Sequence, residues 1–101
     1  MGLIGLARRA GKVVTGHELL KKAMIAGELD LLLIAVDTAV ATVKELEKLA
    51  KEKHIKVIFF STKEKLGNIT GYTASAAVGI NDSGFASRLK QIMPEGRNSL
   101  P

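Results

Sequence analysis

The stretch 31-LLLIAVD-37 decides the fold of this 101-residue chain. It contains six consecutive apolar residues, 31–36, and Asp37 closes the run. An apolar run of this length, without polar alternation, is typical of a strand that is covered on both faces. We therefore expect a buried strand at 31–36 with a layer of helices on each side.

Downstream of this strand, helical and extended patterns alternate. A helix is expected from about 39 to 53, because its apolar residues recur at spacings of three and four and its charged residues lie on the other face. The apolar run 56-KVIFF-60 predicts a second buried strand. The stretch 61-STKE-64 matches a capping box, which would open a short helix that reaches Gly67 or just beyond. The apolar residues that should face inward from the first of these helices are Val43, Leu46, Leu49 and Ala50.

The last third of the chain continues the alternation. Residues 75–80, SAAVGI, predict a third core strand, and a helix is expected from about 83 to 93. That helix would place Phe85, Leu89 and Ile92 on one face. Residues 94–101 form a polar tail that we expect to lie outside the domain.

Upstream of the decisive strand, residues 3–10 predict a short helix that Gly11 would end. Val13 and Val14 form a brief extended segment. The stretch 15-TGHE-18 reads as another capping box, in which the Thr15 hydroxyl would accept a hydrogen bond from the Glu18 amide. The helix that follows would end at Gly27. Its apolar residues at helical spacing are Leu19, Leu20, Ala23, Met24 and Ala26.

This order of elements predicts a three-layer α/β/α sandwich with a central sheet of about four strands. Residues 1–93 would form a single domain. Because the helices at 39–53 and 62–67 each connect two strands, we expect mostly parallel neighbours in the sheet.

Composition excludes several classes of protein. The chain is 47% hydrophobic, which is enough for a packed core, and it has no cysteine, which excludes disulfides and thiolate chemistry. Two histidines in unrelated contexts make a zinc site improbable, and we expect no cofactor. No run of about 18 apolar residues exists, so no membrane partner is expected. The start 1-MGLIGLARRAG-11 places its charges after the apolar residues, unlike a secretory signal, so we expect a cytoplasmic protein. We also expect a monomer, because few apolar residues are expected to be exposed.

Positive charge is concentrated near the start of the chain. The net charge is +5, and residues 1–22 hold five basic side chains against Glu18 as the only acid. A local basic patch of this kind favours an anionic partner, with nucleic acid as the default. The five basic residues are Arg8, Arg9, Lys12, Lys21 and Lys22.

The helix start at Gly16 is the first candidate site. A helix N-terminus presents free amides that suit a phosphate, and a glycine there allows a backbone to approach closely. Lys12, Lys21 and Lys22 are expected to surround it. The alternative is that Thr15, Gly16 and Glu18 only cap a helix and that the lysines are solvated.

Asp37, at the end of a strand, could accept a phosphoryl group, as in a receiver-like or nucleotide-binding enzyme. That chemistry would need further carboxylates to hold magnesium, and none follows the other predicted strands. We therefore expect Asp37 to cap the helix 39–53 or to hold a nearby backbone amide. His17 and His54 read as surface histidines, and no nucleophile–base pair is evident, so an enzyme is not expected.

The third junction is 66-LGNITG-71, followed by Tyr72 and its neighbours. Its two glycines match neither the dinucleotide fingerprint nor the phosphate-loop pattern, and the simplest interpretation is a helix stop and a turn. Aromatic content is only 4%, which disfavours base stacking over an aromatic sheet. A shaped RNA, contacted through phosphates and groove edges, is the better expectation.

Taken together and in this order, these pieces resemble the ribosomal-protein L7Ae family of kink-turn RNA binders, with its L30e and Gadd-type relatives, and most of all the bacterial YlxQ-like subgroup. The resemblance covers residues 3–93. It is carried by 5-GLARRAGKVVTGHELLKK-22, Gly27, 31-LLLIAVD-37, 65-KLGNITG-71 and 84-GFASRLKQI-92.

The resemblance implies a non-enzymatic protein that binds ribosomal RNA or a kink-turn, which is a bent RNA duplex with tandem sheared G·A pairs. The family motif Gly-x-Asn-Glu-x-x-Lys places its glycine on Gly16 and its lysine on Lys22. Glu18 stands at the Asn position and Leu19 at the Glu position. The family's base-contacting loop falls on Tyr72, Thr73 and Ala74, and its Glu-Asp pair on Val36 and Asp37.

The expected RNA-binding residues are Lys12, Gly16, His17, Glu18, Lys21, Lys22, Asp37, Tyr72, Thr73 and Ala74. An alternative follows from the departure at Glu18 and Leu19, because a carboxylate repels phosphate and a leucine cannot read a base edge. In this alternative the chain is a protein-interaction domain of the same fold that has lost kink-turn affinity.

Overall fold

The strand β2 (Leu31–Ile34) lies inside a four-stranded sheet, and all four of its residues are buried, as predicted. The computed structural model describes residues 2–93. Within them β3 (Lys56–Phe59) and β4 (Ala77–Ile80) flank β2, and β1 (Val13–Val14) pairs with the far side of β4. The strand order is therefore β1-β4-β2-β3. The predicted tail at 94–101 lies outside the described residues.

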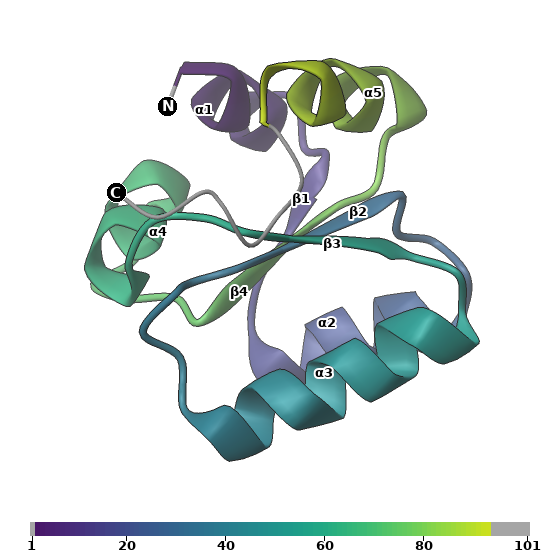
Figure 1. The fold of residues 1–101 in the computed structure, drawn as a ribbon. Coiled ribbons are helices and arrows are strands. Elements are labelled where there is room, and N and C mark those ends of the chain that lie inside the picture. The colour runs from purple at the N-terminus through teal and green to yellow at the C-terminus, as the bar shows by residue number, and fades with distance from the viewer. Residues whose placement is uncertain (1, 94–101) are drawn as a thin grey trace.

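Five helices cover the two faces of this sheet (Figure 1). One face carries α1, α4 and α5, and the other carries α2 and α3. The predicted three-layer α/β/α sandwich is thus confirmed. The helices are α1 (Gly2–Arg9), α2 (His17–Ile25), α3 (Val40–Glu52), α4 (Lys63–Thr70) and α5 (Ser83–Ile92).

The central strand supplies side chains to both halves of the core. Leu31 and Leu33 pack with residues of α1, α4 and α5, whereas Leu32 and Ile34 pack with residues of α2 and α3. This division follows from the two-residue period of a strand, because successive side chains point to opposite faces. An uninterrupted apolar run is therefore what a strand between two helical layers requires.

The direction of β4 corrects the expectation of a mostly parallel sheet. Only β2 and β3 are parallel, and β4 runs antiparallel to both β2 and β1. The reason lies in the path of the chain through α4. The Ser75 amide donates to the Lys63 carbonyl over 2.9 Å, so the segment after α4 returns to the place where α4 began. The chain therefore re-enters the sheet at the end it left, opposite Ile34.

Both predicted capping boxes are wrong by one residue. Helix α2 has Gly16 as its N-cap, with φ 90° and no side-chain cap bond, so Thr15 lies one position too early to cap it. Helix α4 has Thr62 as its N-cap, and the Thr62 hydroxyl accepts from the Lys65 amide over 3.2 Å. Ser61, the predicted cap, is instead buried with a positive φ of 60°.

Two helix faces also differ from the prediction. On α2, Leu20, Ala23 and Met24 are buried, but Leu19 is 63% exposed. On α5, Leu89 is buried as expected, whereas Ile92 is exposed and Met93 takes the inward position. In residues 2–93, none of the helices combines the length and the apolar character that crossing a membrane requires.

Candidate nucleic-acid interface

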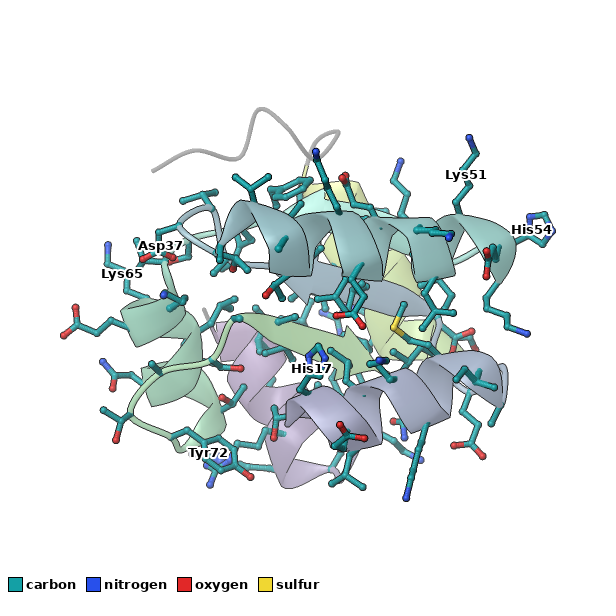
Figure 2. All side chains as sticks on the ribbon, turned by 90° about the horizontal axis from the view of Figure 1, so that it is seen from below. His17, Asp37, Lys51, His54, Lys65 and Tyr72 are labelled. Atoms are coloured by element: carbon teal, nitrogen blue, oxygen red, sulfur yellow. The ribbon has the colours of Figure 1, made fainter. Side chains whose placement is uncertain are left out.

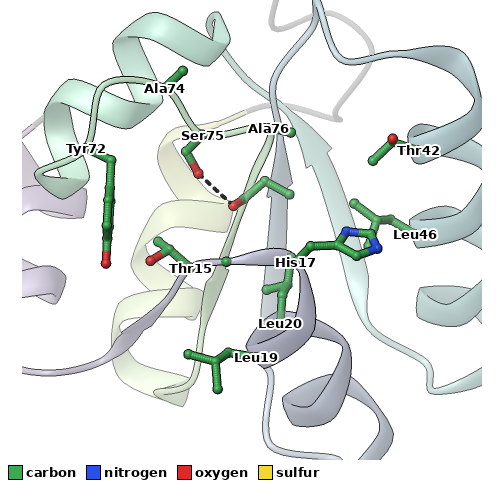
Figure 3. Close-up of a pocket in the computed structure, with 12 residues that line it drawn as sticks. Thr15, His17, Leu19, Leu20, Thr42, Leu46, Tyr72, Ala74, Ser75 and Ala76 are labelled. Carbon is green, nitrogen blue, oxygen red and sulfur yellow. Dashed lines mark hydrogen bonds between the residues drawn. The ribbon is translucent and has the colours of Figure 1, made fainter.

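A groove of about 420 Å³ opens where the start of α2, one face of α3 and the segment before β4 meet (Figure 3). It brings together residues that are up to 62 positions apart in the chain, from Thr15 to Ala77. In the view of Figure 3, Tyr72 and Thr15 lie on one side of the opening and His17 and Thr42 on the other. The lining residues are Thr15, Gly16, His17, Leu19, Leu20, Thr42, Leu46, Tyr72, Ala74, Ser75, Ala76 and Ala77.

Gly16 leaves the mouth of the groove open. Its φ of 90° lies in the region that L side chains rarely adopt, and a Cβ built there would have no atom within 4 Å. The glycine is therefore needed for backbone conformation, and it also leaves the first amides of α2 uncovered. Because no side chain caps this helix start, those amides can donate to an external acceptor.

The segment 71–76, which walls the groove, is irregular in backbone but tied to its surroundings. The Tyr72 amide donates to the Gly67 carbonyl over 2.7 Å, which fixes the point where the chain leaves α4. At the other end, the Thr38 hydroxyl donates to the Ala76 carbonyl over 3.1 Å. The Ser75 hydroxyl donates to the Ala77 carbonyl over 3.0 Å, and this bond is drawn in Figure 3. The wall is therefore held in place before any ligand arrives.

Two exposed apolar side chains line this groove. Tyr72 is 57% exposed and Leu19 is 63% exposed, and both belong to the lining. Exposed aromatic and branched apolar groups beside a cleft are costly in water and suit a flat apolar partner such as a nucleobase face. The sequence pattern placed Leu19 on the core face of its helix, so its position in the lining was missed.

A cluster of charge joins α2 to α3 beside the groove. The Lys21 ammonium donates to Glu45 Oε2 over 2.8 Å, and His17 Nε2 lies 3.3 Å from Glu45 Oε1. The hydrogen bond from Lys21 is the main cause that holds the pKa of Glu45 below its ordinary value. The same bond raises the pKa of Lys21. Glu45 was not among the predicted residues, since no local pattern indicates a partner 24 positions away.

Eight of the ten predicted RNA-binding residues fall into three groups. Gly16, His17, Tyr72 and Ala74 line the groove. The exposed side chains of Glu18 and Lys22 lie on α2, and Thr73 lies between two lining residues. Lys21 is held by Glu45.

Lys12 does not lie at this opening, contrary to expectation. It precedes β1, and its carbonyl accepts from the Asn81 amide over 3.0 Å, at the end of β4 away from Ala77. Three residues separate Lys12 from Gly16, and four steps of extended chain correspond to on the order of 10 Å. The three predicted lysines therefore do not surround one point.

Asp37 has a structural role at the start of α4. Its Oδ1 accepts from the Lys63 amide over 2.8 Å, so it caps α4 together with Thr62. The prediction that it holds a nearby backbone amide is confirmed, and the prediction that it caps the helix 39–53 is wrong. Figure 2 shows Asp37 beside the start of α4, next to Lys65.

The two histidines lie apart, as expected. His17 begins α2 and faces α3, whereas His54 follows the far end of α3 (Figure 2). Across residues 2–93, there is no cluster of three or more histidine and carboxylate side chains that could hold a metal ion.

Comparison with known proteins gives a consistent result. Residues 1–90 match the family described as ribosomal protein L7Ae/L30e/S12e/Gadd45. The RNA-binding protein YlxQ of Bacillus subtilis is 30% identical over 91 residues, which span 90% of this chain and 91% of that protein. The large ribosomal subunit protein eL8 of Halobacterium salinarum is 36% identical over 83 residues, 80% of this chain and 69% of that protein.

Among solved structures, a Bacillus halodurans protein described as having unknown function superimposes with a TM-score of 0.84. It is 30% identical to this chain, and the match covers 88% of this chain and 90% of the other. Its similarity thus extends over nearly the whole fold described above.

Proposed function

Because the chain belongs to the ribosomal protein L7Ae/L30e/S12e/Gadd45 family, we propose that it is a non-enzymatic protein that binds a sharply bent, structured RNA. The proposed partner is a kink-turn or a kinked element of ribosomal RNA. Residues 1–93 would act as one domain and as a monomer, in the cytoplasm.

The observation that carries this proposal is the open groove at Gly16. A bent RNA exposes an unstacked base, and such bases are bound by aromatic and apolar side chains. Tyr72 and Leu19 supply apolar surface at the groove, and the fixed wall at 71–76 reduces the entropy lost on binding. The base would enter between these side chains.

Phosphates would be bound at the same helix start. The uncapped amides at the N-terminus of α2 favour an anion, and the exposed Lys22 is one turn further along. Glu18, also in the first turn, would accept a hydrogen bond from a base amino group and thereby bias the orientation of the RNA. Lys21 would contact a phosphate only after its ion pair with Glu45 breaks.

The proposed contact set therefore comprises Gly16, His17, Glu18, Leu19, Lys21, Lys22, Tyr72, Thr73 and Ala74. Lys12 is left out because its backbone lies at the opposite end of β1. Asp37 is left out because its carboxylate already accepts from the Lys63 amide.

A fluorescence titration with three labelled RNAs tests the proposal. The first is a kink-turn, the second a straight duplex of the same composition, and the third a kink-turn whose tandem G·A pairs are replaced by Watson–Crick pairs. We expect the first to be bound at clearly lower protein concentration than the other two at the same salt concentration. Equal affinity for all three would contradict kink-turn binding while leaving general RNA binding in place.

The exposed Leu19 favours a second candidate, a protein-interaction domain that has lost kink-turn affinity. Its side chain is 63% exposed, and it stands at the position where the family motif has a glutamate that could pair with a base edge. The absence of any shift with micromolar protein at low salt, for all three RNAs, would favour this candidate. If RNA is bound, crosslinking in a cell lysate followed by sequencing of the attached RNA distinguishes ribosomal RNA from other kinked RNAs.

A further inference from the structure

The guanidinium group of Arg8, at the end of α1, lies over Gly71 at the end of α4. A Cβ built on Gly71 would lie 2.8 Å from Arg8 Cζ and 3.1 Å from Arg8 Nε. The guanidinium thus occupies the space that any other side chain at position 71 would need. Gly71 also has a φ of 88°, which favours glycine, and its lack of a side chain lets the guanidinium lie this close.

This contact places a cation at the edge of the groove wall. Gly71 caps α4 and directly precedes Tyr72, which lines the groove. Helix α1 packs against α4, which places the backbone of Arg8 beside the end of α4. The charge of Arg8 therefore lies next to the residue that would contact a base.

The cation has no carboxylate partner within the described part of the chain. Arg8 takes part in none of the ion pairs there, which include those of Lys21 and His17 with Glu45. A guanidinium offers five donors in a planar fork that matches a phosphate, and it can bind one in a bidentate manner. A positioned cation without a counter-ion is suited to an external anion.

We propose that Arg8 is a further RNA-contacting residue, which binds a phosphate of the strand whose base enters the groove beside Tyr72. This inference rests on the proposed RNA-binding function and adds a second phosphate contact, on the side of the wall away from α2.

Salt-dependent titration of the kink-turn RNA tests this role. The variants are Arg8→Gln, which removes the charge, and Arg8→Lys, which keeps the charge but loses the fork. Arg9→Gln is the matched control, because it removes the same charge from the next residue of α1. Arg8→Gln should lower the log–log slope of affinity against salt by roughly 0.7–0.9. Arg9→Gln should leave the slope unchanged, and Arg8→Lys should retain most of it.

The outcomes separate the two proposals. If the unmodified protein binds no RNA, the proposed function fails and Arg8 fails with it. If the protein binds RNA but Arg8→Gln leaves the slope unchanged, or lowers it only as much as Arg9→Gln does, the role of Arg8 is overturned while RNA binding stands. Urea unfolding of each variant checks that the protein, including the groove wall at 71–76, remains folded under the conditions of the titration.

Discussion

Gly67 of α4 lies directly against the backbone of Ala74, since a Cβ on Gly67 would be 2.6 Å from the Ala74 amide nitrogen and 2.8 Å from its carbonyl carbon. Backbone atoms cannot yield as a flexible side chain can. This close approach holds the groove wall against the helix. It also gives the glycine a packing role that a turn signal in the sequence does not reveal.

Gly67→Ala should therefore push the wall outward and lower the free energy of unfolding by about 1–3 kcal/mol, the usual cost of overpacking. Gly5→Ala is the control, because Gly5 also lies in a helix but a Cβ there meets nothing within 4 Å. That variant should be neutral or gain up to about 1 kcal/mol from helix propensity. Urea unfolding measures both, and equal effects would show that the Ala74 contact is unimportant.

Tyr72→Ala should weaken kink-turn binding by about 1–3 kcal/mol, the typical contribution of one stacked base. Tyr72→Phe should retain most of the affinity, because the ring face remains. Ile92→Ala is the control. It removes another apolar side chain, which is 55% exposed on α5 and lies outside the groove, and it should leave the affinity for the kink-turn RNA unchanged. If Tyr72→Ala binds the RNA like the unmodified protein in a fluorescence titration, no base stacks on this ring.

Glu45→Gln should raise RNA affinity several-fold at low salt. The substitution removes a negative charge beside the groove and releases Lys21, whose ammonium is 2.8 Å from Glu45 Oε2. The gain should shrink as salt rises, because both groups are exposed and screened. Titrations at two salt concentrations measure this, and an unchanged or lower affinity would indicate that Lys21 contacts no phosphate.

The same ion pair has a defined pH dependence. The pKa of Glu45 is lowered, first of all by the hydrogen bond from Lys21. The ionised Glu45 carboxylate therefore stabilises the folded protein fully above about pH 4.3, where a free glutamate titrates. This stabilisation is lost as pH falls through the lowered pKa of Glu45 in the folded protein. The pKa of Lys21 is raised, so the stabilisation by its charged ammonium is lost as pH rises through that raised pKa. Urea midpoints of Glu45→Gln should accordingly vary less with pH at both ends.

Asp37→Ala should lower stability by about 0.5–2 kcal/mol through loss of the cap on α4. Asp82→Ala is a control, because Asp82, the N-cap of α5, also accepts from an amide in the first turn of a helix, that of Phe85, over 2.9 Å. The two variants should lose similar stability and bind RNA alike. A larger loss of RNA affinity for Asp37→Ala would restore Asp37 to the contact set.

The layered architecture could be predicted because local patterns determine it. The uninterrupted run at 31–36 requires cover on both faces, and the spacing of Leu46 and Ala50 fixes the inward face of α3. The direction of β4 could not be predicted in this way. It depends on where the chain returns after α4, which the hydrogen bond between Ser75 and Lys63 marks and no local pattern encodes.

The site was predicted in part for the same reason. Gly16 and Tyr72 stand out by residue type, and both line the groove. The pairing of Lys21 with Glu45 and the exposure of Leu19 depend on how α2 packs against α3, which no local spacing encodes. The cap of α2 was displaced by one residue because the positive φ of Gly16 shifts the helix start beyond Thr15. The cap of α4 was displaced in the same way, because Ser61 has a positive φ and Thr62 follows it as the N-cap.

The central claim is that RNA binds at the groove between the start of α2 and the wall at 71–76. Mapping of amide chemical-shift changes on addition of kink-turn RNA to the full chain tests it most directly. We predict the largest changes at Gly16, His17 and residues 71–76, with little change in α5 or at the exposed edge of β3. Changes concentrated on α5 or β3, with the groove residues unaffected, would contradict the account.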